Sequence, residues 1–316
     1  MGAGFARIHD LFAGERYQVA RKELWQHFLA LVRRPMGFIG LAVILAFVVI
    51  ATLAPVIAGP FPSYFPPLNT GAPNEPPSSQ FPLGTDPTGR SNFALLVYGS
   101  RVSLIIGAVS SIIATVIGTL VGVAAGYYGK FPDKGLSMLT NFFLVIPWLP
   151  FVLVVASIVR EIDIPGVRPE GKPFFATLIS ISLVSWPTTA RVVRSKVLSV
   201  KTLAYVQRAR AIGAGDGHIM WRHIIPVLLP LVFANTILTV SSAIWTESFL
   251  AFFGLSDVSQ PSWGAMIERS WRNLDFVSGA YWAFLPPGVC ITGLVLAFTM
   301  VSRVMEDMLN PRLRKR

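Results

Sequence analysis

The chain has 316 residues, of which 53% are hydrophobic and only 14% are charged, and its formal net charge is +11. Soluble domains carry about 25% charged residues, so this composition excludes an ordinary water-soluble protein and predicts an all-α membrane protein. The single cysteine, and four histidines without zinc-ligand spacing, exclude a disulfide scaffold and a structural metal site.

Six apolar runs are each long enough to cross a hydrocarbon core of roughly 30 Å as a helix. An even number of spans places both termini on the same side of the membrane. The first run is longer than the apolar core of a signal peptide, so we expect it to remain as an uncleaved helix. The six predicted spans are residues 36–58, 102–127, 136–159, 174–193, 225–253 and 281–304.

In this topology the basic residues are concentrated on one side of the membrane. Of the 27 Lys and Arg residues, 20 lie before the first span, between the second and third spans, from Arg191 to Arg222, or from Arg303 onward. The positive-inside rule then places both termini in the cytoplasm. Because topology explains the charge, the basic excess does not indicate nucleic-acid binding.

Outside the spans, three segments have a composition of their own. Residues 1–35 form a cytoplasmic N-terminal segment in which residues 16–34 are amphipathic and basic, which predicts a helix along the inner interface. Residues 59–100 form an extracytoplasmic segment, rich in Pro and Gly up to Asn92, for which we expect an ordered lobe or lid, with a plain loop as the alternative. A five-helix core over 101–305 and a basic cytoplasmic tail over 306–316 complete the chain.

Small residues recur at every fourth position of the second span. Such a ladder allows a second helix to approach closely in a membrane, so we expect helix packing there rather than contact with a solute. The ladder consists of Ser110, Ala114, Gly118, Gly122 and Gly126.

The spans hold little that resembles catalytic chemistry. The sequence has no phosphate-binding loop, no H-E-x-x-H or G-x-S-x-G motif and no paired-carboxylate cluster. Glu247 is a carboxylate inside the fifth span, where an unpaired charge costs about 3 kcal/mol. We expect it either to be hydrogen-bonded near the outer interface or to contribute to a pore or gate.

Residues 201–226 form a polar, basic segment between two apolar runs. The positions of Leu203, Val206, Ala209 and Ile212 predict a short amphipathic helix. A break at Gly213, a second short helix capped by Asp216 and a new helix beginning at Pro226 follow. This cytoplasmic helix-turn-helix is either an interfacial connector or a docking site for another protein.

This segment resembles the EAA loop of ABC-importer permeases, whose pattern is E-A-A, three residues, G, nine residues, I-x-L-P. Gln207-Arg208-Ala209, Gly213 and Pro226 keep the spacing, whereas the Glu, the first Ala, the Ile and the Leu of the pattern are replaced. Other stretches over residues 25–314 are similar, in the same order, to the C-type subunit of dipeptide and oligopeptide permeases, with Asn92 in place of a usual Asp. They are LGTDPTGRSNFALLVYGSRVSL, AAGYYGKFPD, LVIPWLPFVLV, TESFLAFFGL, PSWGAMI, LPPGVCI and LNPRLRKR.

The resemblance implies a type I ABC importer permease with six spans, which is not itself an enzyme. A homologous B-type permease subunit would complete the pore. Two cytoplasmic ATPase subunits would bind ATP and Mg, and an extracytoplasmic solute-binding protein would deliver the solute, in a bacterial or archaeal cell membrane. Residues 201–226, which we call the coupling loop, would meet an ATPase. Contact with anionic membrane lipid is the alternative role for the arginines of this loop. The residues expected to couple it to the ATPase are Gln207, Arg208, Ala209, Arg210, Gly213, Ala214, Asp216, Arg222 and Pro226.

The resemblance favours di- or oligopeptides as cargo, with nickel chelates, glutathione and oligosaccharides as alternatives within the family. From another class, an ion-coupled secondary transporter is the main rival, followed by a membrane-bound enzyme or a scaffold. Membrane anchoring is the alternative role for the aromatic residues among the candidates for the translocation path. These candidates are Phe142, Phe143, Trp148, Trp245 and Glu247.

Overall fold

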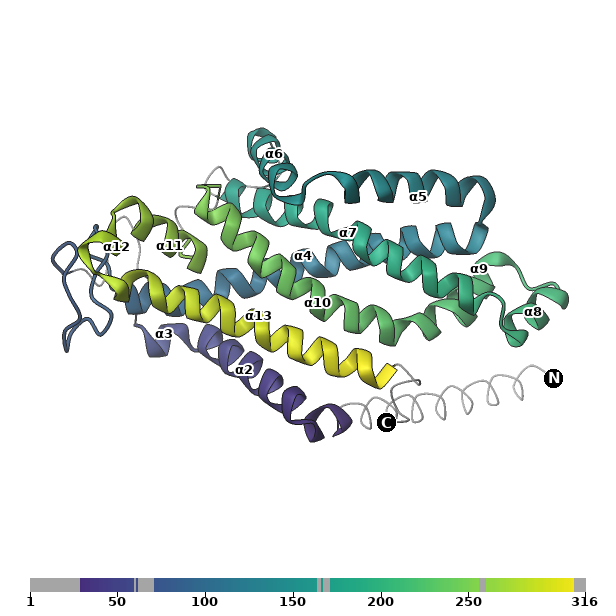
Figure 1. Cartoon of the computed structure of the whole chain (residues 1–316), viewed down its shortest axis with the longest axis horizontal. Helices are drawn as coiled ribbons and strands as arrows, with labels where there is room; N and C mark the ends of the chain where they lie inside the picture. The colour runs from purple at the N-terminus through teal and green to yellow at the C-terminus, as the bar shows by residue number, and fades with distance from the viewer. Residues whose placement is uncertain are drawn as a thin grey trace.

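The computed structural model describes residues 29–59, 61, 71–163, 166, 171–255 and 260–309. Most of the predicted interfacial helix over 16–34, and the tail from residue 310, lie outside them. Most of the long helices run roughly along one axis (Figure 1). They are α2 (Pro35–Thr52), α3 (Ala54–Ile57), α4 (Asn92–Tyr128), α5 (Lys130–Val145), α6 (Trp148–Glu161), α7 (Lys172–Val200), α8 (Ala204–Ala211), α9 (Asp216–Ile219), η2 (Met220–Ile224), α10 (Ile225–Phe252), α11 (Trp263–Arg272), α12 (Asp275–Ser278) and α13 (Tyr281–Leu309).

Helices occupy all six predicted span positions. By length and composition, four of the described helices can cross a membrane: α2, α4, the continuous helix Asp216–Phe252, and α13; the bent pair α5 and α6 would be a fifth. The helix α7 is long enough to cross a membrane, but its Ser and Thr residues lower its mean hydropathy. It packs against α4, α5, α6 and α10, so protein rather than lipid surrounds much of it. The count of six spans remains a prediction.

The third predicted span is not a straight helix. Its two halves, α5 and α6, meet at 99°, and Figure 1 shows α6 turned away from the axis of α5. The ring of Pro147 disfavours a helical conformation at the preceding residue, and Ile146 is extended, with φ −66° and ψ 131°. This segment is therefore a broken span or a re-entrant pair, which corrects the expected single helix over 136–159.

The first two spans also differ from their expected bounds. The helix α2 ends at Thr52, six residues early, where the Arg101 guanidinium of α4 donates hydrogen bonds to the carbonyl oxygens of Ala51 and Thr52. The helix α4 begins at Asn92, ten residues early, because the Ser91 hydroxyl accepts a hydrogen bond from the Ala94 N–H (3.3 Å) and caps its first turn. Residues 92–100, expected in the outer segment, are thus helical.

The small-residue ladder of α4 lies against α7. A Cβ added to Gly118 or Gly122 would lie 2.6 Å from the carbonyl oxygen of Trp186 or Ala190, and one on Gly126 would lie 2.7 Å from the Cβ of Val197. Ser110 and Ala114 are buried on the same helix. Since no side chain separates the two backbones at three successive turns, α4 and α7 form the closely packed centre of the bundle.

At one end of the bundle, residues 71–91 fold over the start of α4 around a buried ion pair. The Asp86 carboxylate accepts hydrogen bonds from the Arg90 side chain (2.6 and 3.0 Å), and its Oδ2 lies 3.4 Å from an Arg269 nitrogen of α11. Burial alone would raise the pKa of Asp86, but the Arg90 guanidinium and the hydrogen bond from Thr88 outweigh it and lower the pKa. This carboxylate therefore joins residues 71–91 to α11.

We predict that Asp86→Asn destabilises the protein by about 3 kcal/mol, since it removes from a buried ion pair the carboxylate charge on which the Arg90 and Arg269 guanidinium groups converge. Thermal unfolding at pH 7 measures the loss. Because the pKa of Asp86 lies below its ordinary value of 3.8, its stabilising contribution is complete at neutral pH and disappears as the pH falls through the lowered pKa.

The matched control is Asp163→Asn, because Asp163 also pairs with a cation, Lys172, but its side chain is 94% exposed. Exposed ion pairs contribute little, so its melting temperature should hardly change. Equal effects of the two variants would contradict a structural role for the buried pair.

Candidate functional site

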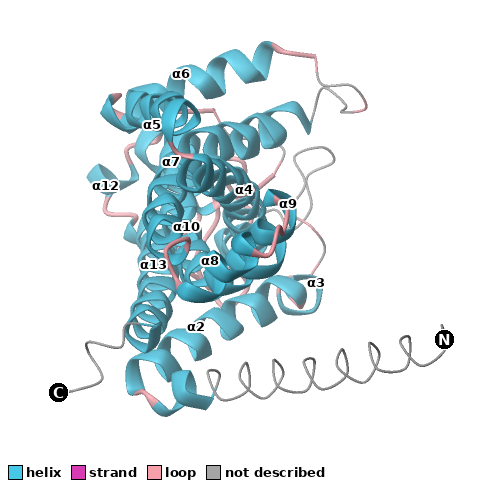
Figure 2. Cartoon of the chain, turned by 90° about the vertical axis from the view of Figure 1, so that its right-hand side faces the viewer, coloured by secondary structure: helices cyan, strands magenta, loops and turns pink. Residues whose placement is uncertain are grey.

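The helix-turn-helix expected over 201–226 is present at the end of the bundle opposite α11 and α12 (Figure 1), and it faces the viewer in Figure 2. The helix α8 ends at Ala211, and the turn passes through Gly213 with φ +85°, a left-handed conformation that favours glycine. Nothing lies within 4 Å of the position that a Cβ on Gly213 would take. Gly213 therefore shapes the turn and leaves its outer side open.

An apolar cluster holds this loop on the transmembrane helices. Val206 and Ala209 of α8 and Ile219 of α9 are buried, and they pack with residues of α4, α7 and α10. The other two apolar positions of the expected stripe, Leu203 and Ile212, are exposed, Ile212 by 85%. The loop is thus anchored through its middle and presents an isoleucine at its tip.

A polar contact fixes the second half of the loop to α4. The Tyr127 hydroxyl, at the end of α4, donates a 2.6 Å hydrogen bond to Asp216 Oδ1, and the Arg210 guanidinium lies 5.4 Å from the centre of the Tyr127 ring. Asp216 was expected to cap α9, but it is the first residue of that helix and Gly215 takes the cap position. Its carboxylate instead ties α9 to α4.

Pro226 lies in the first turn of α10, where a helix was expected to begin, but this helix is not separate from the loop. The chain is helical from Asp216 to Phe252, and the five residues before α10, Met220–Ile224, form a π-helical turn. Proline offers no N–H and its ring crowds the carbonyl one turn back. A wider turn at this point accommodates it, so the loop and α10 form one continuous element.

The outward side of the loop is cationic and partly apolar. Within the described part of the chain, Arg208 and Arg222 have no acidic partner. Gln207 donates to the Lys201 carbonyl oxygen (2.7 Å), and Ala214 is half-buried behind the turn. An open groove of about 460 Å³ is lined by His218, Trp221, Arg222 and Pro226. This surface offers free positive charge beside exposed Ile212 and Trp221.

The aromatic candidates for the path fall into two groups. Trp148 of α6 and Trp245 of α10 both pack on Phe249, at 5.7 and 5.6 Å between ring centres, and both are nearly half exposed. Phe143 lies inward against Phe151 and Trp186, whereas its neighbour Phe142 is 61% exposed. The bend between α5 and α6 therefore presents an aromatic surface next to α10.

Glu247 lies apart from these aromatic residues. It is 1% exposed, and its Oε2 accepts hydrogen bonds from Ser103 of α4 (3.1 Å) and Ser248 (3.5 Å). Side chains two positions apart in an α-helix point in directions that differ by about 200°. Glu247 and Trp245 therefore face different sides of α10. A side chain this buried joins α10 to α4 and does not contact a solute in this conformation.

Three partners of the site were not expected from the sequence. Tyr127 holds Asp216, the Lys201 ammonium donates to the Gly126 carbonyl oxygen (2.6 Å), and Arg194 of α7 pairs with Asp133 of α5 (2.5 and 2.8 Å). Tyr127, Gly126 and Asp133 all lie in the AAGYYGKFPD stretch. The Tyr127 hydroxyl and the Asp133 carboxylate lie between two predicted spans, at their predicted inner ends, and this position was the sequence signal that could have indicated these contacts.

Long apolar helices, a broken helix pair and a helix-turn-helix fastened to the end of the bundle define a multi-span membrane component of a transporter. Residues 118–315 match the model of the binding-protein-dependent transport system inner membrane component, and the chain belongs to this family. Residues 23–77 match the N-terminal TM domain of oligopeptide transport permease C. The family comprises ABC-importer permeases, whose ATPase is a separate subunit, so the chain is not an enzyme.

Curated relatives extend over nearly the whole chain. The dipeptide transport system permease protein DppC of Alkalihalophilus pseudofirmus is 31% identical over 91% of this chain and 89% of its own length. A probable peptide ABC transporter permease of Sinorhizobium fredii is 33% identical (90% and 91%), and the oligopeptide permease OppC of Bacillus subtilis is 29% identical (96% and 95%). An inward-facing structure of the MetNI methionine ABC transporter shares the fold, with TM-score 0.52 and 19% identity over 70% of this chain and 97% of that one.

We predict that Tyr127→Phe loosens the loop, because it removes the O–H that holds Asp216. Amide hydrogen exchange over residues 204–219 should become several-fold faster, with a loss of global stability of about 1 kcal/mol. The neighbouring Tyr128→Phe is the control, since Tyr128 is half exposed and has no hydrogen-bonding partner for its hydroxyl among the described residues. Equal exchange in the two variants would show that the hydrogen bond does not hold the loop.

Proposed function

We propose that this chain is one permease subunit of an ATP-driven, binding-protein-dependent importer of di- or oligopeptides. Family membership supports the transport role, and the names of the dipeptide and oligopeptide permeases it resembles support the cargo. The observation that carries the mechanism is the rigidly anchored loop formed by α8, α9 and the π-helical turn. Nickel chelates, glutathione and oligosaccharides remain alternative cargoes within the family.

In this proposal both termini and the loop are cytoplasmic, as the Lys and Arg distribution predicts. The loop enters a groove on one of two ATPase subunits, which bind ATP and Mg. Exposed Ile212 supplies an apolar contact at the tip, and Arg208 and Arg222 pair with acidic groups of the ATPase. A homologous B-type permease subunit completes the pore, and an extracytoplasmic solute-binding protein delivers the peptide.

The anchoring contacts explain how closure of the ATPases would reach the pore. When ATP draws the two ATPases together, each docked loop moves with its ATPase. Since Val206 and Ile219 are buried against α4, α7 and α10, and Asp216 is bonded to Tyr127, these helices follow the loop as a rigid body. The chain thereby converts ATPase closure into helix movement without catalysing a reaction itself.

Two features bear on the rival classes. An ion-coupled secondary transporter needs coupling groups at the membrane midplane that an ion can reach, whereas Glu247 is 1% exposed and accepts a hydrogen bond from Ser103. The aromatic surface of Trp148, Phe249 and Trp245 is permissive for varied side chains, which suits a permease whose solute is already selected by a binding protein.

We predict that Gly213→Arg abolishes co-purification of the ATPases while leaving the permease heterodimer intact. A large charged side chain at the outer side of the turn, in a left-handed conformation, blocks and distorts the docking surface. The measurement is a tagged pull-down in mild detergent with quantification of every subunit recovered.

The matched control is Gly213→Asn, because asparagine enters the left-handed region more readily than other side chains and carries no charge. It should keep most of the bound ATPase. Retention of the ATPases by Gly213→Arg would rule out docking through this turn, and solute movement by the purified chain alone under an ion gradient would establish the secondary-transport alternative.

A further inference from the structure

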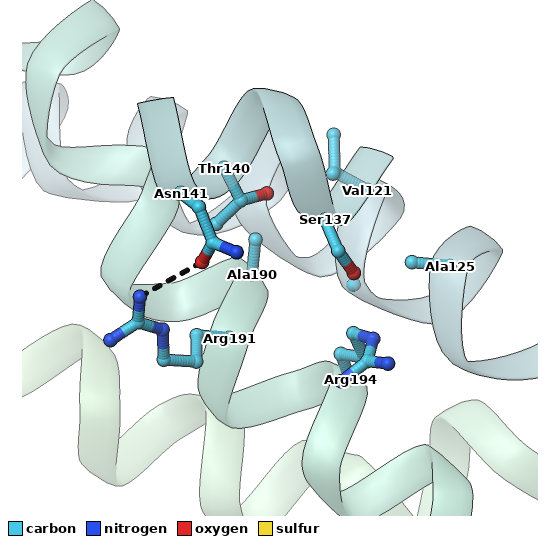
Figure 3. Close-up of a pocket in the computed structure, with 9 residues that line it drawn as sticks. Val121, Ala125, Ser137, Thr140, Asn141, Ala190, Arg191 and Arg194 are labelled. Carbon is cyan, nitrogen blue, oxygen red and sulfur yellow. Dashed lines mark hydrogen bonds between the residues drawn. The ribbon is translucent and has the colours of Figure 1, made fainter. Parts of the chain in front are cut away.

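A cavity of about 210 Å³ lies between α4, α5 and α7, on the half of the bundle that carries the coupling loop. Figure 3 shows its polar side chains, with Arg191 hydrogen-bonded to Asn141 and Arg194 beside Ser137. The small residues Gly122, Ala125 and Ala190 line it as well. It is thus a polar cavity that opens between three helices.

The two arginines of this cavity are not equally compensated. Arg194 pairs with the Asp133 carboxylate through two nitrogens, at 2.5 and 2.8 Å. Arg191 donates to the neutral amide oxygen of Asn141 (3.0 Å), and among the described residues it has no carboxylate partner. The cavity therefore carries one uncompensated positive charge, together with unused N–H donors on Arg191 and Asn141.

The depth of Arg191 in the bilayer follows from helix geometry. Lys172, which pairs with Asp163, begins α7 at the end of the bundle that is extracytoplasmic in the orientation proposed above. Arg191 follows Lys172 by 19 positions, which is roughly 29 Å along a helix. The hydrocarbon core is about 30 Å thick, so with α7 as the fourth predicted span and Lys172 at its outer boundary, Arg191 would lie at the opposite boundary, where lipid phosphates begin.

The surface next to the cavity is apolar. On α5, Met138 and Phe142 flank the lining residues Ser137 and Asn141, and their side chains are 76% and 61% exposed. A ligand with an anionic head and a hydrocarbon chain would match both the cationic cavity and this apolar surface. Its head would neutralise Arg191, and its chain would cover Met138 and Phe142. Basic pockets between helices on the cytoplasmic side are typical sites for anionic lipid head groups.

We propose that this cavity binds the phosphate of an anionic phospholipid of the cytoplasmic leaflet through Arg191 and Asn141. The lipid would bridge α5 and α7 next to the Arg194–Asp133 pair and so stiffen the base on which the coupling loop rests. The inference uses the orientation proposed above but depends on neither the cargo nor ATPase docking, so its test is independent of both.

The test uses the complete permease complex purified in a neutral detergent, with phosphatidylglycerol as the anionic probe and phosphatidylcholine as the zwitterionic one. Native mass spectrometry counts retained lipid, and thermal unfolding gives the stabilisation. Phosphatidylglycerol should be retained and should raise the melting temperature. In Arg191→Gln its binding should weaken about tenfold or more, because charge-assisted hydrogen bonds are lost.

Lys196→Gln is the matched control, because Lys196 is an exposed cation on the same helix, outside the cavity lining. It should bind the lipid as the unaltered protein does. If Arg191→Gln does not assemble, Asn141→Leu replaces it and should weaken binding without changing the charge. Unchanged binding in both cavity variants, or an equal loss in Lys196→Gln, overturns the proposal.

A peptide could bring an anion to the same cavity through its C-terminal carboxylate. If a free-acid peptide, but not the same peptide amidated, displaces phosphatidylglycerol in proportion to its concentration, the cavity belongs to the cargo and the lipid proposal is wrong. The proposal predicts that neither peptide displaces the lipid.

Discussion

The close approach of α4 and α7 is the constraint on which the rest of the structure depends. At Gly118, Gly122 and Gly126 any Cβ would collide with α7, so the two helices are held at a distance that only these residues permit. Both helices end beneath the coupling loop, where Val197 and Val200 of α7 and Tyr127 of α4 contribute to the apolar cluster that holds it. If the helices separated, Tyr127 would move away from Asp216 and the loop would lose its base.

Around this centre, a carboxylate that accepts hydrogen bonds connects neighbouring segments at each end of the bundle. At one end the Asp86 carboxylate joins residues near the start of α4 to α11, and at the other the Asp216 carboxylate joins α9 to the end of α4. Between them, Glu247 of α10 accepts from Ser103 of α4. Two carboxylates thus connect α4 to its neighbours and a third joins the segment before it to α11, which favours movement of the helices as one body over bending of single helices.

Several elements were predictable because they depend on local patterns. Long apolar runs located the helices, the four-residue spacing of small side chains located the face of α4 that meets α7, and Gly213 located the turn of the loop. The family also followed from the order of short motifs along the chain. Each of these signals lies within a few consecutive turns of one segment.

What the sequence did not predict depends on contacts between distant segments. Asp216 has the position and chemistry of a helix cap, but Tyr127, 89 residues away, takes its carboxylate. Ser103, the partner of Glu247 on another helix, is 144 residues away. The helix α7 is less apolar than its neighbours because other helices surround it, and the 99° bend at Pro147 exceeds what a proline inside a helix requires, since Pro187 and Pro230 are accommodated within their helices.

The most direct measurement is cross-linking from the tip of the loop in the assembled complex. With Cys290 replaced by alanine, Ile212→Cys carries a short thiol-to-amine cross-linker, and Val277→Cys, 70% exposed at the other end of the bundle, carries it as the control. We predict a product that joins this chain to an ATPase subunit from position 212 and none from position 277. Absence of the ATPase product at 212, with both cysteines fully labelled, would contradict docking through this loop.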